Sequence, residues 1–142
     1  MKVHRPEITL NGVLVERLCA KIGVELIVGA RNDPQWGPVV LVGFGGVLAE
    51  AIHDTRLLPL DLDPASIERE LEKLRSAPLL RGLRGLPPAD VRAAVDVVSR
   101  IGSLNQARPE IEEIDINSLL VHEKEDGAIT LDALISVAQK RQ

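Results

Sequence analysis

Aromatic side chains are almost absent from the sequence. Trp36 and Phe44 are the only two among 142 residues, so a hydrophobic core has to be built from Leu, Ile, Val and Ala. Two rings are also too few for the base stacking by which proteins bind single-stranded nucleic acids. Lys and Arg number 17 against 21 Asp and Glu, and the basic residues are not clustered, which argues against a nucleic-acid-binding function.

Cysteine is equally scarce. The single Cys19 excludes an internal disulfide and a cysteine-based metal site. It has no obvious base partner and is expected to be a small core residue. The three histidines, His4, His53 and His122, do not have the spacing of metal ligands. The sequence therefore gives no support for a cysteine nucleophile or a zinc site.

Long apolar runs are missing as well. No stretch approaches the roughly 18 apolar residues that a membrane span needs, and no signal peptide is visible. The apolar share of 45% is enough for one domain with its own core. We therefore expect a single domain over residues 1–142 of a cytoplasmic protein.

The first third of the chain is predicted to be extended. Residues 12–18 form a short β-branched run, which predicts a strand. Residues 23–33 and 37–46 are two further apolar runs, and the turn-forming residues between them predict an antiparallel hairpin. Residues 47–60 could form a strand or a short helix, and we favour an extended segment that ends at Pro59.

Two stretches in the middle of the chain have helical periodicity. The first has Asp63 as a cap and Pro64 in the first turn, and is expected to stop at Pro78. The second covers residues 88–107 and ends before Pro109. Each carries an apolar stripe at helical spacing: Ile67, Leu71 and Leu74 in the first, and Val91, Val95, Val98 and Ile101 in the second.

The last third of the chain returns to strands. Residues 110–123 and 128–138 are apolar runs joined by the turn-forming sequence KEDG. The order is then three or four strands, two helices and two strands. This order predicts an α+β fold in which helices cover one side of a mostly antiparallel sheet.

Polar residues interrupt the first of these last strands at every second position. Glu113, Asp115 and Asn117 would therefore point to one face. Asp132 on the return strand could join Asp115 and Asn117 if the register brings it to that face. Oxygen ligands of this kind suit Mg²⁺. The same alternation is also typical of a half-exposed sheet whose polar side faces water, and the pattern alone favours this second interpretation.

Other positions give weaker signals. The glycines among residues 43–46 could bring backbone N–H groups close to a phosphate, but the Lys and Ser/Thr of a P-loop are absent, and a tight turn is the simpler interpretation. Glu16 and Glu25 could accept hydrogen bonds from ribose hydroxyls, or could simply face solvent. Glu50 and Asp54 are typical of a surface acidic pair.

Taken in order, several motifs resemble a known family. They are ELIVG with DPQWGP (residues 25–38), GFGG followed by Glu50, LLRGLRGLPPAD (residues 79–90), and EIDINSLLV (residues 113–121). Together they resemble the C-terminal half of the ATP-grasp domain in NDP-forming acyl-CoA synthetases. That family includes ADP-forming acetate–CoA ligase and is similar to the succinyl-CoA synthetase β subunit. The resemblance covers roughly residues 8 to 135.

The resemblance implies a set of ligand-binding residues for ATP or ADP and for Mg²⁺. The metal ligands would be Asp115, Asn117 and Asp132. Ser118 stands where the family usually has proline. The nucleotide-binding residues would be Glu16 beside the adenine, Glu25 at the ribose, and Gly45 and Gly46 near the phosphates. The resemblance implies no definite role for Glu50, Asp54 or Arg84.

The resemblance also implies a reaction and its missing parts. Complete enzymes of this family convert a carboxylate, CoA and ATP into acyl-CoA, ADP and phosphate through a phosphohistidine. The first lobe of the ATP-grasp domain and the CoA-binding and ligase domains have no counterpart in this chain. We therefore interpret the chain as a fragment of a longer protein, inactive alone, whose partners are these missing parts or a second copy of itself. The alternative is a non-catalytic regulatory or assembly module, as in acetyltransferase fusions of this domain.

Overall fold

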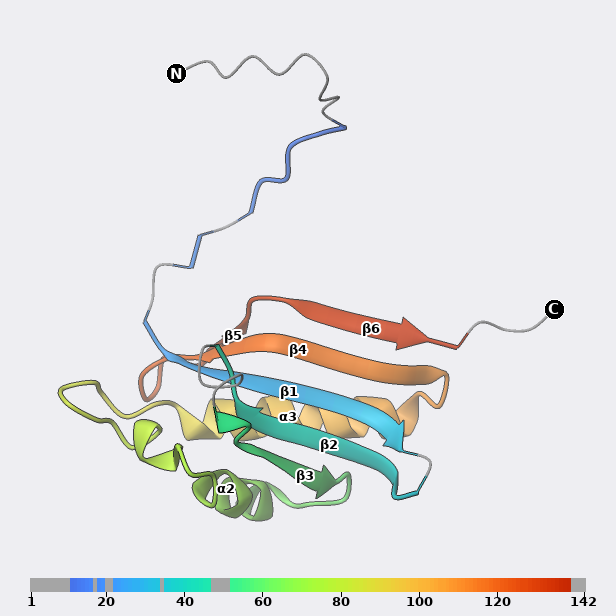
Figure 1. Ribbon diagram of the computed structural model, residues 1–142, viewed down its shortest axis with the longest axis horizontal. Helices are drawn as coiled ribbons and strands as arrows, with labels where there is room; N and C mark the ends of the chain where they lie inside the picture. Colours follow the sequence, from blue (N-terminus) through green and yellow to red (C-terminus); the bar gives the residue numbers. More distant parts are fainter. Residues whose placement is uncertain (1–10, 17, 20–21, 34, 47–51, 139–142) are drawn as a thin grey trace.

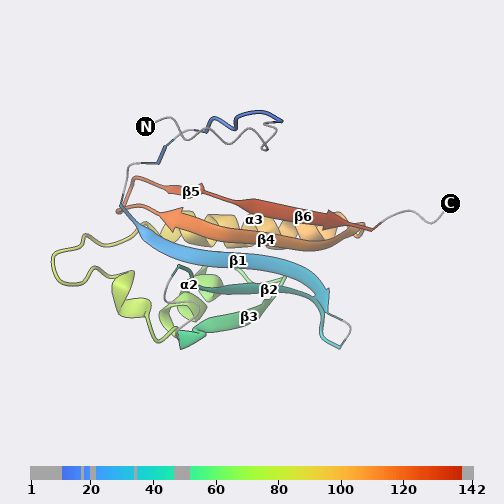
Figure 2. The ribbon, with the colours of Figure 1, turned by 45° about the horizontal axis from the view of Figure 1, so that its top comes forward.

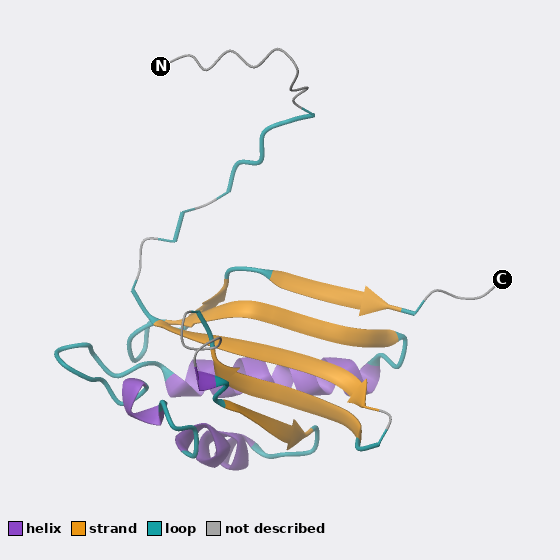
Figure 3. Ribbon diagram, viewed as in Figure 1, coloured by secondary structure: helices purple, strands orange, loops and turns teal. Residues whose placement is uncertain are grey.

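The computed structural model describes residues 11–16, 18–19, 22–33, 35–46 and 52–138. Within these residues, six antiparallel strands form one sheet in the order β3–β2–β1–β4–β5, and β6 also pairs with β4 (Figure 1). Helices α2 and α3 lie on the same face of the sheet (Figure 3). The predicted α+β fold, with helices on one side of an antiparallel sheet, is confirmed.

The first three strands of the structure correspond to the segments predicted to be extended at residues 23–33, 37–46 and 47–60. β1 (Val24–Asp33) and β2 (Gly37–Phe44) make the predicted hairpin. Asp33 closes its turn, because its Oδ1 accepts hydrogen bonds from the N–H groups of Gln35 (2.9 Å) and Trp36 (3.1 Å). β3 (Thr55–Pro59) pairs with β2 and ends at the predicted proline. Residues 47–51 lie outside the described part of the chain.

Helix α2 (Pro64–Glu72) begins where the sequence predicts and ends early. Asp63 caps it by accepting a hydrogen bond from Ser66 N–H at 2.9 Å. The prediction that it continues to Pro78 is wrong, because Asp54 accepts the N–H groups of Arg75 and Ser76 and holds a turn there. The short 3₁₀ helix η1 (Ala77–Leu79) follows this turn.

Helix α3 (Val91–Ala107) packs against β1, β2 and β4. Its N-cap residue, Asp90, accepts a hydrogen bond from Ala93 N–H at 3.1 Å. The second carboxylate oxygen of Asp90 accepts the N–H groups of Glu125 and Gly127, both at 3.1 Å. Asp90 therefore joins the start of α3 to the turn that follows β4.

The core fills the space between the helices and the sheet. Side chains with at most 2% of their surface exposed include Leu26, Val28, Val42, Phe44, Leu58, Leu71, Val98, Ile114 and Leu119. Phe44 is the one aromatic residue in this set, as the near absence of aromatic residues requires. None of the helices in the described residues has both the length and the apolar character needed to span a membrane.

The C-terminal strands surround the most polar stretch of the sheet. β4 (Ile111–Val121) has β1 on one side and β5 (Ala128–Thr130) and β6 (Ala133–Val137) on the other (Figure 2). The predicted return strand is therefore split at Asp132. The pairing of β4 with β1 contains a bulge: Leu26 faces Leu119 whereas Ile27 faces Asn117, so one residue of β4 is unmatched.

The strand predicted at residues 12–18 is absent from the described residues of that range. Residues 11–16 run outside the sheet as an extended segment (Figure 1). The side chains of Val13, Leu14, Val15 and Leu18 are each more than 80% exposed. A β-branched run becomes a strand only when a partner strand binds its backbone, and the described residues place none beside it.

Candidate functional site

One face of the sheet is not covered by any helix of the described residues. On β1, Leu26, Val28 and Ala30 are buried beneath the helices, so the alternate residues point the other way. We call this second surface the open face. It carries Glu25, Ile27, Gly29 and Arg31 from β1, and Glu113, Asp115 and Asn117 from β4.

The strand register sets the neighbours of the β4 polar residues. Ile27 lies opposite Asn117, and Gly29 lies opposite Asp115. Because Gly29 has no side chain, nothing from β1 covers the Asp115 carboxylate. A Cβ added at Gly29 would come within 3.3 Å of the Ile114 carbonyl oxygen, so the close strand approach also favours glycine here.

Asp132 lies beside Asn117 in the break between β5 and β6. The Asn117 N–H donates a hydrogen bond to the Asp132 carbonyl oxygen at 3.2 Å, and the next pair along is Ile116 with Ala133. Opposite residues of antiparallel strands project to the same face. The register therefore places Asp132 on the open face, and Asp115, Asn117 and Asp132 are all exposed.

The chemistry of these three side chains fits a hard divalent cation. They offer two carboxylates and one amide oxygen, which are ligands of the kind that Mg²⁺ accepts together with water and phosphate oxygens. In the described residues, no three His, Cys, Asp or Glu side chains form a ready metal site. A cation here would therefore depend on the Asn117 amide and on ligands from outside the chain.

The structure also brings Glu25 and the glycine turn together. Gly45 N–H donates to the Glu25 carbonyl oxygen at 2.8 Å. Gly46 has a φ of +60°, and a Cβ there would approach the Glu25 Oε2 to 3.0 Å. The Gly45 N–H is therefore already hydrogen-bonded to β1, and a position of Gly45 and Gly46 near the phosphates stays a prediction. Glu16 lies in the extended N-terminal segment, so its place beside these residues stays a prediction.

Asp54 has a structural position that the sequence did not reveal. It is 7% exposed, whereas a surface acid was predicted. Burial raises the pKa of the Asp54 carboxyl, but hydrogen bonds from Arg75 N–H (3.0 Å) and Ser76 N–H (2.7 Å) outweigh burial and hold the pKa below its usual value. Glu50 lies outside the described residues. Arg84 occupies an exposed loop with a φ of +52°.

A cavity of 280 Å³ opens on the open face beside Asp115. We call it the Asp115 cavity. Its lining includes Gly29, Arg31, Leu41, Leu57, Glu113 and Asp115. Gly29 and Arg31 were not predicted as site residues. The alternation of buried and exposed residues along β1 places both of them on the same face as Glu25.

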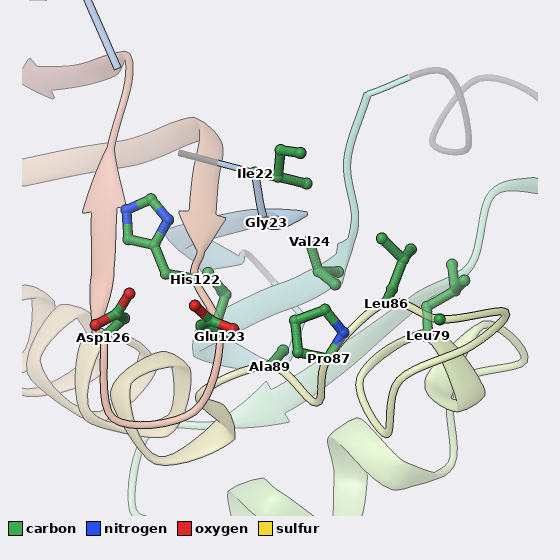
Figure 4. Close-up of a pocket in the computed structure, with 12 residues that line it drawn as sticks. Ile22, Gly23, Val24, Leu79, Leu86, Pro87, Ala89, His122, Glu123 and Asp126 are labelled. Atoms are coloured by element: carbon green, nitrogen blue, oxygen red, sulfur yellow. The ribbon is translucent and has the colours of Figure 1, made fainter. Parts of the chain in front are cut away.

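A larger cavity of 530 Å³ lies at the end of the sheet, between the start of β1, the end of β4 and the loop before α3 (Figure 4). Most of its lining is apolar, including Val24, Leu79 and Leu86. Among the described residues that line it, the acidic ones are Glu123 and Asp126.

Comparisons with known proteins agree with the fold. The family model of the ATP-grasp domain matches residues 1–137. A trans-feruloyl-CoA synthase from an unknown prokaryotic organism is 48% identical over 137 residues, which are 96% of this chain and 19% of that protein. The β subunit of an ADP-forming acetate–CoA ligase from Pyrococcus furiosus is 36% identical over 132 residues, which are 92% of this chain and 55% of that subunit.

A solved structure matches as well. It is the dinucleotide-forming acetyl-coenzyme A synthetase 1 of Ca. Korarchaeum cryptofilum, with a TM-score of 0.77 and 35% identity. The match covers 84% of this chain and 55% of that one. That protein was solved with coenzyme A and Mg-AMPPCP, its phosphohistidine segment pointing towards the nucleotide binding site. The chain thus spans about half of the β subunit and a fifth of the synthase.

Proposed function

The chain belongs to the ATP-grasp domain family, and on this premise we propose that it is the nucleotide- and Mg²⁺-binding second lobe of an ADP-forming acyl-CoA synthetase. The observation that carries the proposal is the gathering of Asp115, Asn117 and Asp132 on the open face. The names of the relatives, acetate–CoA ligase and feruloyl-CoA synthase, support this class of reaction.

The metal would be held at the β4 edge of the open face. Asp115 and Asn117 supply ligands from β4, and Asp132 supplies one from the neighbouring chain segment. These residues would hold a Mg²⁺ ion, whose positive charge would offset the charge of the phosphates during phosphoryl transfer. None of the three side chains would act as a nucleophile. Their task is to fix the position of the phosphates.

The nucleoside would lie at the start of β1, where Glu25 stands next to the glycine turn. Glu25 can accept hydrogen bonds from ribose hydroxyls, and Gly46 lies close to the Glu25 carboxylate without a side chain of its own to crowd it. Along a strand, residues on one face are about 7 Å apart. Asn117 is opposite Ile27, one such step from Glu25, and Asp115 is opposite Gly29, two steps away. Glu25, Asn117 and Asp115 therefore follow one another along the open face in the order in which a nucleotide would place its ribose and then its phosphates.

The remainder of the enzyme would come from segments outside this chain. In our proposal these are the first ATP-grasp lobe and the CoA-binding and ligase domains, which convert a carboxylate, CoA and ATP to acyl-CoA, ADP and phosphate. The exposed apolar side chains of Val13, Leu14 and Val15 support a missing partner, because apolar strand-forming residues are rarely left in water.

A second candidate function is a non-catalytic assembly or regulatory module. The same exposed segment favours it, since it would also suit a partner that merely docks, including a second copy of this chain. Binding of nucleotide separates the two proposals. A module that binds no ligand does not require Glu25, Asn117 and Asp115 to be arranged in order on one face, whereas a nucleotide-binding lobe does.

The test is a nuclear magnetic resonance titration of the ¹⁵N-labelled chain with Mg-ADP. We expect weak binding, because the opposing lobe is absent, with amide shifts at Glu25, Gly46 and Asn117. Asp115→Ala should abolish them without altering the rest of the spectrum. Shifts confined to the larger cavity of Figure 4, or no shifts at saturating ligand, would reject the proposal in favour of the assembly module.

A further inference from the structure

The Asp115 cavity contains an arginine that the metal and nucleotide assignments leave unused. We propose that Arg31 binds the terminal phosphate of a nucleoside triphosphate, at the end of the open face remote from Glu25. The inference rests on the proposed function, because it takes the ribose to lie at Glu25 and the cation at Asp115. It adds a reason why the lobe would distinguish a triphosphate from a diphosphate.

The position of Arg31 follows from the alternation of β1. Ala30 is buried with 3% of its surface exposed, so Arg31 points to the open face like Glu25 and Gly29. It lies three same-face steps from Glu25 and one step beyond Gly29, the residue opposite Asp115. A nucleotide that starts at Glu25 and passes Asp115 therefore directs its last phosphate toward Arg31.

The charges around the cavity give Arg31 a distinct task. Glu113 and Asp115 line the cavity, and Arg31 is the one cationic residue among the described residues that line it. The two carboxylates repel a phosphate unless a cation stands between them. An arginine can bind two phosphate oxygens at once through its planar guanidinium group. Arg31 is therefore the protein group in the lining that can hold the phosphate directly.

Arg31 is free to move from its present partner. Its Nη2 donates to the Asp33 Oδ2 at 3.2 Å, and its side chain is 61% exposed, so the pair adds little stability. The other oxygen of Asp33 accepts the N–H groups of Gln35 and Trp36, which hold the turn. Arg31 can leave Asp33 and reach a ligand without opening the hairpin.

The cavity also has room for the phosphate. Gly29 contributes no side chain next to Asp115, and the aliphatic side chains of Leu41 and Leu57 line the cavity without offering hydrogen bonds. A phosphate that enters finds hydrogen-bond donors chiefly on Arg31. The difference in affinity between a triphosphate and a diphosphate should therefore depend mainly on the Arg31 side chain.

The experiment compares a non-hydrolysable triphosphate analogue with ADP, each with Mg²⁺, on the full chain. The Arg31 side-chain Nε–Hε signal should shift with the triphosphate and stay in place with ADP. Arg31→Gln should weaken triphosphate binding about tenfold, the range of one charge-assisted hydrogen bond, and leave ADP binding unchanged. Arg31→Lys keeps the charge without the two-pronged contact, and should show an intermediate loss.

Arg100→Gln is the matched control. Arg100 is also exposed and paired, with Asp96 at 2.9 Å, but it lies on α3. Its loss should change neither affinity. If Arg31→Gln binds both nucleotides as the unaltered chain does, the inference is overturned while the proposed function stands. If neither nucleotide shifts the signals of Asp115 and Asn117, the proposed function fails, and the inference fails with it.

Discussion

The two faces of strand β4 have opposite properties within a few residues of each other. Ile114 and Ile116 are buried beneath the helices, with 1% and 5% of their surface exposed. Glu113, Asp115 and Asn117, which alternate with them, are exposed on the open face. The same backbone thus serves the core on one side and the candidate site on the other.

Along β4, the buried residues should therefore determine the stability of the fold, and the exposed residues should determine ligand binding. Buried aliphatic residues contribute to folding because they leave water, whereas exposed acids add little to it. A residue of the open face can therefore be selected for ligand binding at small cost to the fold. Substitutions on the two faces should have effects that do not overlap.

The largest expected effect is on the covered face. Ile114→Ala should lower the free energy of unfolding by about 3 kcal/mol, because it removes a buried side chain and leaves a cavity. Asp115→Ala, the neighbouring substitution on the open face, should change it by less than about 0.5 kcal/mol. Urea unfolding of both variants measures the difference. Equal destabilisation by the two substitutions would mean that the faces are not separable in this way.

Asp54 differs from the acids of the open face because it is buried, and its substitution should therefore affect stability. Asp54→Asn should lower the free energy of unfolding by about 2 kcal/mol, because the amide cannot accept the N–H groups of both Arg75 and Ser76. The matched control is Asp61→Asn, an exposed acid in the neighbouring loop, which should have almost no effect. Urea unfolding at neutral pH measures both.

The loss in Asp54→Asn should also depend on pH. The pKa of Asp54 is lower in the folded chain than its ordinary value, and the unfolded value is about 3.9. The carboxylate therefore stabilises the fold fully above the unfolded pKa, and this contribution disappears as the pH falls through the folded pKa. The difference between the two proteins should narrow below about pH 4. A constant difference down to pH 2 would contradict this assignment.

The smallest expected effect is a gain in stability. Asn105 on α3 is 2% exposed, and neither its amide nitrogen nor its oxygen has a hydrogen-bond partner among the described residues. Asn105→Leu, which fills a similar volume without polar atoms, should raise the free energy of unfolding by about 1 kcal/mol. A lower melting temperature in this variant would show that the amide is satisfied by water or by another part of the protein.

The regular elements could be predicted because their signals are local. The stripe of Ile67 and Leu71 at helical spacing, and the alternation around Asp115, reflect burial on one side, which the chain carries in its own order of residues. Caps such as Asp63 are equally local. These features can be predicted without knowing which distant residues pack against them.

The features that were missed depend on contacts between distant residues. The end of α2 is set by Asp54, about twenty positions away. The bulge in β4 appears only when β1 is placed beside it. The strand expected at residues 12–18 needs a partner, and no local pattern shows whether one is present. For the candidate site, the sequence suggested Asp115 and Asn117, but only the register places Asp132 beside them.

The most direct test of the central claim is paramagnetic line broadening by Mn²⁺, a probe for Mg²⁺ sites, on the ¹⁵N-labelled chain. Low Mn²⁺ concentrations should broaden the amide signals of Asp115, Asn117 and Asp132 first. Excess Mg²⁺ should reverse the effect, and Asp115→Ala should prevent it. Broadening that begins at other acids, such as Glu123 and Asp126, and leaves these three signals sharp would contradict a metal site on the open face.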